Sequence, residues 1–218
     1  MQTNRSLFNV IFFSTIVLLS IVSCGEAESK LEKSLIENNE EQEVDLGFSD
    51  ILGTKWINQE DSSTAEIGFE IEGLKDAKGF FEDFDITFKV SEKGQSNAKL
   101  KVVIDVSSIN TENSMRDKAL MEDDFFNTEK YPTITFFSKN ITKEENQYIA
   151  NGVVEMMGVK NELSLYFKHK GITKNKSNIE VAIFEGEFKI DRTMFGMTHT
   201  PSVGDQVKVH FYCELVSK

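Results

Sequence analysis

The feature that most constrains the fold of this chain is a series of eight short segments in which apolar and polar residues alternate. They comprise residues 67–71, 84–90, 100–106, 134–136, 148–156, 163–167, 184–190 and 207–211. A period of two places successive side chains on opposite faces of an extended strand, so each segment has one apolar face. Turn-forming residues separate several of the segments, as at 92–94 and 174–178. The pattern therefore predicts eight antiparallel β-strands, each with one buried face.

Eight strands of this kind favour an all-β fold in which the sheet closes into an antiparallel barrel over residues 48–218. Full closure removes the unpaired strand edges that would otherwise promote aggregation. A barrel of eight strands is just wide enough to be filled by side chains or to hold one slender ligand. A sandwich of two sheets is the alternative, because alternation alone does not distinguish the two architectures.

One segment, residues 113–122, departs from the alternation and is predicted to form a short helix. Asn113 or Ser114 is able to cap its first turn. Its apolar side would be narrow and consist of Met115, Ala119 and Leu120. An aromatic pair, Phe125 and Phe126, follows directly and would pack the helix over one mouth of the barrel. Such a helix would act as a lid, or it would simply dock there without any gating.

Residues 1–23 have the pattern of a bacterial lipoprotein signal peptide. Arg5 precedes an apolar stretch, residues 7–21, that is too short and too often interrupted by polar residues to span a membrane well. The stretch ends in Ile-Val-Ser-Cys, a lipobox in which Cys24 would become the lipidated first residue of the mature protein. Several acyl chains on one residue would anchor the protein stably without spanning the membrane. The alternative is a chance cysteine behind an ordinary signal peptide.

Residues 24–47 are polar and acidic, and we expect them to form a flexible tether between the anchor and the barrel. A short helix or a surface-sorting signal within this stretch is an alternative to a plain spacer. The net charge of the chain is −12, which argues against nucleic acid and against electrostatic attraction to anionic lipid. We expect a lipid-anchored protein of the bacterial cell envelope that faces the periplasm or the cell surface.

No feature of the sequence indicates an enzyme or a cofactor. His169, His199 and His210 lack the spacing of metal ligands and are better explained as solvated or rim residues, with His210 on the polar face of its strand. Neither a glycine-rich phosphate loop nor a nucleophile motif is present. If Cys24 is acylated, no intramolecular disulfide is possible. Cys213 shares the apolar face of the last alternating segment, which predicts a buried structural thiol.

Four motifs, in their order and spacing, are similar to those of one bacterial family. Residues 79–88 resemble the family's second strand, with Phe81 and Phe84 at its two usual aromatic positions. Residues 108–137 join a strand end, a short charged helix and a Tyr-Pro pair, as the family's helix-containing connection does. Residues 151–160 resemble its turn before a strand, and 190–197 its late Asp-Arg-x-x-Phe-Gly signature. On these motifs the chain resembles the YceI-like family of bacterial lipid-binding barrels.

The resemblance implies an extended, lipocalin-like barrel with one short helix at a barrel mouth. It also implies that the lumen holds an amphiphilic polyisoprenoid, such as a quinone or a prenyl phosphate derivative. The apolar side chains expected to line the lumen are Phe69, Phe81, Phe84, Ile86, Phe88, Val102, Ile104, Phe125, Phe126, Phe136, Val154, Met156, Leu165, Phe188, Phe195, Val209 and Phe211. Gly152 and Gly186 on the inward faces would leave room for a prenyl chain. Equally, these side chains would pack against one another as a filled core.

Charged residues near the barrel ends are candidates for contacts with a ligand head group. Arg116, Asp191 and Arg192 are the three that we consider. A structural ion pair or a hydrogen-bonded corner is the alternative for Asp191 and Arg192. The chain also departs from the family in residues 63–73, which lack two histidines that the family usually carries, although Phe69 is retained. This departure indicates a different lipid, or none.

Two further functions compete with that of a lipid carrier. The first is an interaction module with a filled barrel core, which would bind another envelope component through its acidic exterior or its loops. The second is an accessory subunit that presents a quinone to a membrane enzyme. The content of the lumen distinguishes the carrier from the interaction module, and redox-active cargo would favour the accessory subunit.

Overall fold

A computed structural model of the chain describes residues 47–60, 62–74, 76–91, 94–198 and 203–218. These residues belong to one compact unit, Glu43–Lys218. The predicted signal peptide, Cys24 and nearly all of the predicted tether lie outside the described residues. No helix among the described residues is both long enough and apolar enough to cross a membrane.

Strands make up most of the described residues. They are β1 (Lys55–Ile57), β2 (Ala65–Ile71), β3 (Lys78–Phe81), β4 (Phe84–Ser91), β5 (Gly94–Asp105), β6 (Ile109–Asn110), β7 (Thr133–Glu144), β8 (Gln147–Met156), β9 (Val159–Lys174), β10 (Glu180–Asp191) and β11 (Gln206–Ser217). The helices among the described residues are α2 (Ser114–Met121) and three short 3-10 turns, η1 (Ser62–Thr64), η2 (Val106–Ser108) and η3 (Arg192–Phe195). Seven of the eight predicted segments lie within a strand, and the eighth, 100–106, lies in β5 except for Val106, which begins η2.

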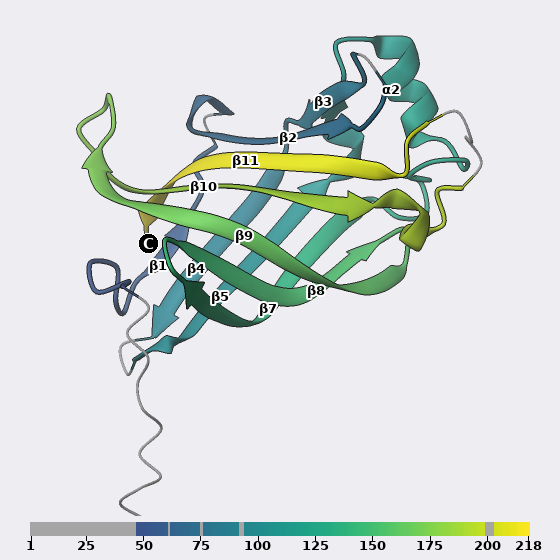
Figure 1. The fold of residues 1–218 in the computed structure, drawn as a ribbon. Helices are drawn as coiled ribbons and strands as arrows, with labels where there is room; N and C mark the ends of the chain where they lie inside the picture. The colour runs from purple at the N-terminus through teal and green to yellow at the C-terminus, as the bar shows by residue number, and fades with distance from the viewer. Residues whose placement is uncertain (1–46, 61, 75, 92–93, 199–202) are drawn as a thin grey trace, which may run out of the picture. The chain divides into compact units, whose positions relative to one another are not determined.

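Eight antiparallel strands close into a barrel, as Figure 1 shows. Their order around the ring is β1-β4-β5-β7-β8-β9-β10-β11, and β11 returns to pair with β1. Closure at this point uses two residue pairs, Trp56 with Ser217 and Ile57 with Val216. The predicted eight-stranded antiparallel barrel is confirmed, and the sandwich alternative is excluded.

The identity of one strand in the ring differs from the prediction. The alternating segment 67–71 forms β2, which pairs with β11 along residues 207–213 and then continues the sheet through β3 and β6. The strand that closes the ring is instead β1, which has only three residues. A three-residue strand is too short to show a periodicity, so alternation could not predict it.

The barrel wall is not uniformly paired. β9 and β10 form a ladder from Glu180 opposite Lys174 to Gly186 opposite Phe167, and beyond that pair the two strands diverge (Figure 1). The turn η3 lies beside this end of β9, where the Asn161 side-chain amide donates a hydrogen bond to the Met194 carbonyl at 3.0 Å. Phe195 of η3 is buried in the core. An apolar wedge therefore takes the place of strand pairing in this part of the wall.

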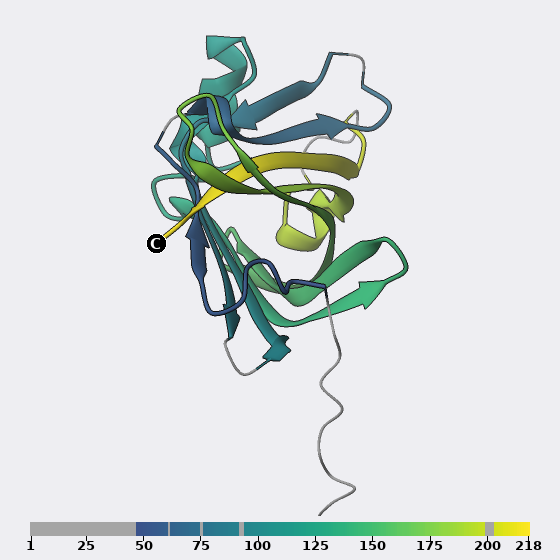
Figure 2. The ribbon, with the colours of Figure 1, turned by 90° about the vertical axis from the view of Figure 1, so that its left-hand side faces the viewer.

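The end of the barrel near β1 is sealed by aromatic packing. The segment that precedes β1 crosses this end, which faces the viewer in Figure 2. Phe48 and Ile51 of this segment are completely buried. The Phe48 ring stacks on Tyr148 at a centroid distance of 4.3 Å and meets the edge of Phe88 at 5.2 Å. This cluster closes one end of the lumen, so the open end lies on the opposite side, near α2.

The helix α2 begins and ends within one residue of the predicted bounds. The Asn113 side-chain oxygen accepts hydrogen bonds from the backbone N–H groups of Met115 and Arg116, both at 3.1 Å, so it is the predicted cap. The predicted apolar side is wrong in part, because the Met115 side chain is 81% exposed and Ala119 is also exposed. Leu120 is the member that packs against the core.

Removal of the Phe48 ring should destabilise the barrel strongly. We expect Phe48→Ala to lower the free energy of unfolding by about 3–5 kcal/mol, because the surrounding rings cannot collapse fully into the space left behind. Urea titration followed by circular dichroism measures this change.

Leu52→Ala, a change in the same segment at a residue that is 39% exposed, provides the control. It should alter stability by about 0.5 kcal/mol. Equal effects of the two substitutions would contradict the assignment of Phe48 as a buried seal.

Candidate functional site

The lumen of the barrel contains a cavity of about 200 Å³. Its lining side chains come from most strands of the ring, from β2 and β3, from α2 and from the loop after η3. They are Ile67, Phe69, Ile71, Phe81, Ile86, Phe88, Leu100, Val102, Ile104, Leu120, Phe125, Phe126, Ile134, Phe136, Val154, Met156, Leu163, Leu165, Phe167, Phe184, Phe188, Ile190, Arg192, Met197, Val203, Val207, Val209, Phe211, Cys213 and Leu215, together with Gly68. With the exception of Arg192, the thiol of Cys213 and the thioethers of Met156 and Met197, these side chains are hydrocarbon.

Burial of the lining residues changes from one end of the cavity to the other. Phe88, Phe184 and Leu215, near the sealed end, are no more than 3% exposed. Leu120 and Phe126, near α2, are only partly buried. The cavity is therefore deep and dry at the sealed end and approaches the surface beside α2, where the predicted helix covers part of the mouth.

Fifteen of the seventeen residues predicted to line the lumen do line this cavity. The two exceptions are Phe84 and Phe195, which contribute to the core without lining the cavity. Phe84 has the inward orientation of Ile86 but lies at the very start of β4, and Phe195 belongs to the wedge η3. Alternation identified the inward faces correctly but could not show where along each strand the cavity ends.

The expected role of two glycines is wrong. A Cβ atom on Gly152 would lie 2.7 Å from the Phe136 ring, and one on Gly186 would lie 2.6 Å from the Phe211 ring. Both glycines therefore accommodate aromatic rings of the neighbouring strands, and neither lines the lumen cavity. The space that they provide is already occupied by protein.

The Arg192 guanidinium is a structural clamp. The side chain is 5% exposed and donates hydrogen bonds to the carbonyl oxygens of Gly204 at 2.9 Å, Val203 at 2.8 Å and Met197. Its Nη2 atom also lies 3.3 Å from a carboxylate oxygen of the exposed Asp205. The carbon part of the side chain faces the cavity, while its donors hold the loop between η3 and β11. This is the hydrogen-bonded corner that was the alternative to a head-group contact.

The other two rim candidates do not line the cavity. Arg116 donates hydrogen bonds from Nε and Nη2 to the hydroxyl and carbonyl oxygens of Thr111, at 2.9 and 2.7 Å, and thereby ties α2 to the end of β6. Asp191 accepts hydrogen bonds from the backbone and hydroxyl of Thr193, which hold the pKa of its carboxyl below the usual range. Both side chains hold elements near the open end in place.

Two titratable side chains in the barrel interior are largely withdrawn from water. Cys213 is 2% exposed and lines the cavity, so its prediction as a buried thiol is confirmed, and burial raises its pKa to about 12. His169 was expected to be a solvated or rim residue, but its side chain is 4% exposed and its ring stacks on Phe184 at a centroid distance of 4.9 Å. Burial lowers its pKa, and Asp50 at 3.9 Å acts in the opposite direction.

Neither of the other two histidines is among the described residues of the barrel interior. His210 lies on the outer face of β11, as predicted, with Nε2 3.3 Å from a carboxylate oxygen of Glu66. His199 lies outside the described residues. Within the described residues, three or more His, Cys, Asp or Glu side chains do not come together in any arrangement that could hold a metal ion.

Comparisons with known proteins agree on one family. A model of the YceI-like domain matches residues 59–215. The chain is 36% identical over 128 residues to UPF0312 protein plu2095 of Photorhabdus laumondii, and 35% identical over 120 residues to Protein YceI of Salmonella arizonae. These alignments cover 58% and 55% of this chain. The chain spans about two thirds of the length of these relatives, 67% of the first and 63% of the second.

Solved structures share the fold. A YCEI protein of Campylobacter jejuni is 30% identical with a TM-score of 0.57, covering 68% of this chain and 87% of its own. BcnA of Burkholderia cenocepacia superposes with a TM-score of 0.61 at 20% identity, covering 72% and 98% of the two chains. A Saccharophagus degradans domain, described as a polyisoprenoid binding domain implicated in plant cell wall breakdown, has a TM-score of 0.54 at 12% identity, covering 75% and 98%.

Cys213 should be nearly inert towards alkylating reagents while the barrel is folded. A thiol with a pKa of about 12 has roughly a thousandfold less thiolate at pH 8 than one with the ordinary pKa of 9.0, and the thiolate is the reactive form. We expect iodoacetamide to modify Cys213 at least about a thousandfold more slowly in the folded protein than in guanidinium chloride. Mass spectrometry of the peptide that carries Cys213 measures both rates, and comparable rates would contradict burial of the thiol.

Loss of the Arg192 guanidinium should destabilise the barrel. We expect Arg192→Ala to cost about 3 kcal/mol, because three carbonyl groups lose a buried donor. Arg192→Lys should restore little, since one ammonium group cannot reproduce the planar array of donors.

Urea unfolding measures both variants, with Lys189→Ala as the control. Lys189 is about half exposed and pairs with Glu72 on the surface, so its loss should cost no more than about 1 kcal/mol. A neutral effect of Arg192→Ala would show that the clamp is dispensable.

Proposed function

Because the chain belongs to the YceI-like family, we propose that it is a non-enzymatic protein that binds an amphiphilic, apolar lipid in the barrel lumen. The lipid class that we propose is an isoprenoid. The family membership and the fold shared with a domain described as polyisoprenoid binding both support this choice. No residue is proposed to carry out chemistry on the lipid.

The observation that carries the proposal is the composition of the cavity. About thirty residues from all around the barrel converge on a space of about 200 Å³ that is lined almost entirely by hydrocarbon. Removal of apolar surface from water gains about 25 cal/mol per Å². Burial in the cavity thus makes the binding free energy of a hydrocarbon ligand favourable. A polar or charged ligand would lose its hydration there without compensating hydrogen bonds.

The surroundings of the mouth favour a lipid with an uncharged head group. Arg192 directs its donors at backbone carbonyl groups and at the Asp205 carboxylate, and Arg116 directs Nε and Nη2 at the hydroxyl and carbonyl oxygens of Thr111. The exposed carboxylates flanking α2 are Glu112, Glu122, Asp123 and Asp124. These four carboxylates outnumber the exposed Lys118 of α2 and would disfavour a phosphate, so a quinone or an alcohol fits the mouth better than a prenyl phosphate.

We also propose that the protein works at the bacterial cell envelope. Residues 1–23 would direct export, and acylated Cys24 would hold the barrel at a membrane through the acidic stretch that follows. The barrel would then collect or store a membrane lipid in the periplasm or at the cell surface. Labelling of the protein by a radioactive fatty acid, and its loss in Cys24→Ala, would test the anchor directly.

A second function is favoured by the way the lumen is filled. The rings of Phe136 and Phe211 occupy the positions above Gly152 and Gly186, and the remaining cavity is small. A barrel that is mostly filled with its own side chains would suit an interaction module that binds another envelope component through its outer surface. The content of the lumen decides between the two functions.

Lipid binding is tested by a matched pair of substitutions on β8. Val154 points into the cavity and Val153 points outward from the adjacent position. We expect Val154→Phe to fill the cavity and to weaken the binding of a prenyl alcohol at least about tenfold, because even one added ring takes up much of the space. Val153→Phe should bind as the original protein does.

Native mass spectrometry with organic extraction measures bound lipid in both variants, and circular dichroism verifies that each is folded. A cavity that stays free of lipid in the original protein, even after prenyl alcohols are added, would favour the interaction module. Equal binding by the two variants would place the lipid outside the lumen.

A further inference from the structure

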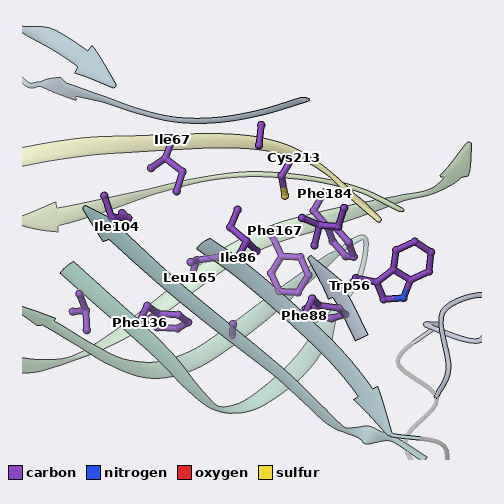
Figure 3. Close-up of a cluster of buried hydrophobic side chains, with 14 of the residues drawn as sticks. Trp56, Ile67, Ile86, Phe88, Ile104, Phe136, Leu165, Phe167, Phe184 and Cys213 are labelled. Carbon is purple, nitrogen blue, oxygen red and sulfur yellow. The ribbon is translucent and has the colours of Figure 1, made fainter. Parts of the chain in front are cut away.

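The lumen cavity ends on a layer of three aromatic rings, which we call the floor: Phe88, Phe167 and Phe184. These rings belong to β4, β9 and β10, and all three line the cavity. Their centroids lie 5.0 Å apart for Phe88 and Phe184, and 6.1 Å apart for each of the other two pairs. Figure 3 shows the three rings together towards Trp56, with Phe136 and Ile104 at the other side of the cluster.

A second aromatic layer lies behind the floor. Phe48 meets Phe88 edge to face at 5.2 Å, and Tyr148 stacks on Phe167 at the same centroid distance. The His169 ring stacks on Phe184 at 4.9 Å. None of the residues in this second layer lines the cavity. Each floor ring is therefore supported from behind, and a ligand cannot push the floor back without unpacking the sealed end.

We propose that the floor sets the length of the isoprenoid chain that the protein holds, with Phe88, Phe167 and Phe184 as the specificity-determining residues. This inference rests on the proposed function. The chain enters tail first, because the floor offers no polar partner, and its polar end stays at the mouth beside α2. The terminal methyl groups rest on the floor.

The volume of the cavity limits how many isoprene units of the lipid can be buried. An apolar cavity of about 150 Å³ holds one benzene ring of six carbons, so 200 Å³ holds roughly eight carbons, or between one and two isoprene units. Each unit that fits inside leaves water and should raise the affinity by at least about tenfold. Units beyond about the second remain at the mouth, in contact with water, and should raise the affinity only slightly.

The affinities of a series of prenyl alcohols test this inference. The full-length protein, freed of lipid, is titrated with alcohols of one, two, three, four and eight isoprene units, and bound alcohol is measured by native mass spectrometry. In the original protein we expect affinity to level off at two to three units. Phe184→Ala removes a floor ring and should move that plateau to a chain about one unit longer.

Phe188→Ala is the matched control. Phe188 lies on the same face of β10 and also lines the cavity, but it is not part of the floor. Its loss widens the cavity without deepening it, so the plateau should stay at the same chain length. Phe184→Leu is a milder change that keeps the sealed end packed, and it should move the plateau in the same direction as Phe184→Ala by a smaller amount.

The outcomes separate this inference from the proposed function. A plateau that shifts with the Phe184 variants and not with Phe188→Ala supports the floor. Affinity that rises with every unit up to eight in the original protein would overturn the length limit but leave lipid binding intact. An equal shift with Phe188→Ala, or no shift in a folded Phe184→Leu variant, would also overturn it. Absence of binding at every length would remove both proposals.

Discussion

The aromatic packing at the sealed end is the interaction on which the rest of the barrel depends. The ring of strands closes through only two β1–β11 residue pairs, too few to hold a barrel shut by backbone hydrogen bonds alone. Trp56 of β1 is 4% exposed, and the segment before it inserts Phe48 and Ile51 completely into the core. Burial of these large side chains keeps β1 between β4 and β11, and so defines both the closed wall and the blind end of the lumen.

Much of the fold could be predicted from the alternation, because strands with one buried face obey a period of two along their whole length. The same rule identified most of the residues that line the cavity, from Phe69 to Phe211. The alternation failed to predict residues outside long strands. β1 is too short to show a period, and Phe195 lies in a 3-10 turn. His169 was misjudged because β9 continues to Lys174, well beyond the end that its apolar residues indicated, and this extension carries the imidazole into the core. Packing across strands, such as the Phe136 ring above Gly152, depends on registers that a sequence does not display.

The charged residues at the open end show why motif positions alone do not assign roles. Arg192 and Asp191 lie in the signature that resembles the family's, and from the sequence either could meet a ligand. In the structure their polar atoms hold the turn η3 and the loop after it, where β9 and β10 no longer pair. The backbone carbonyl groups of that loop need donors because strand pairing does not supply them. The arginine thus satisfies the carbonyl groups of Met197, Val203 and Gly204, which lie outside the strands and take no part in a ladder.

The two ends of the lumen consequently differ in how tightly they are held. The sealed end consists of stacked rings with almost no exposure, whereas the end near α2 combines partly buried side chains, a diverging pair of strands and a loop held by one guanidinium. Local opening costs least where few apolar contacts are lost, so the structure would open first beside α2 and last at the aromatic floor. A lipid carrier requires this difference, because its cargo must enter without disturbing the packing that keeps the barrel closed. The packing that stabilises the barrel therefore lies at the blind end of the cavity, and the entrance lies at the more loosely held end beside α2.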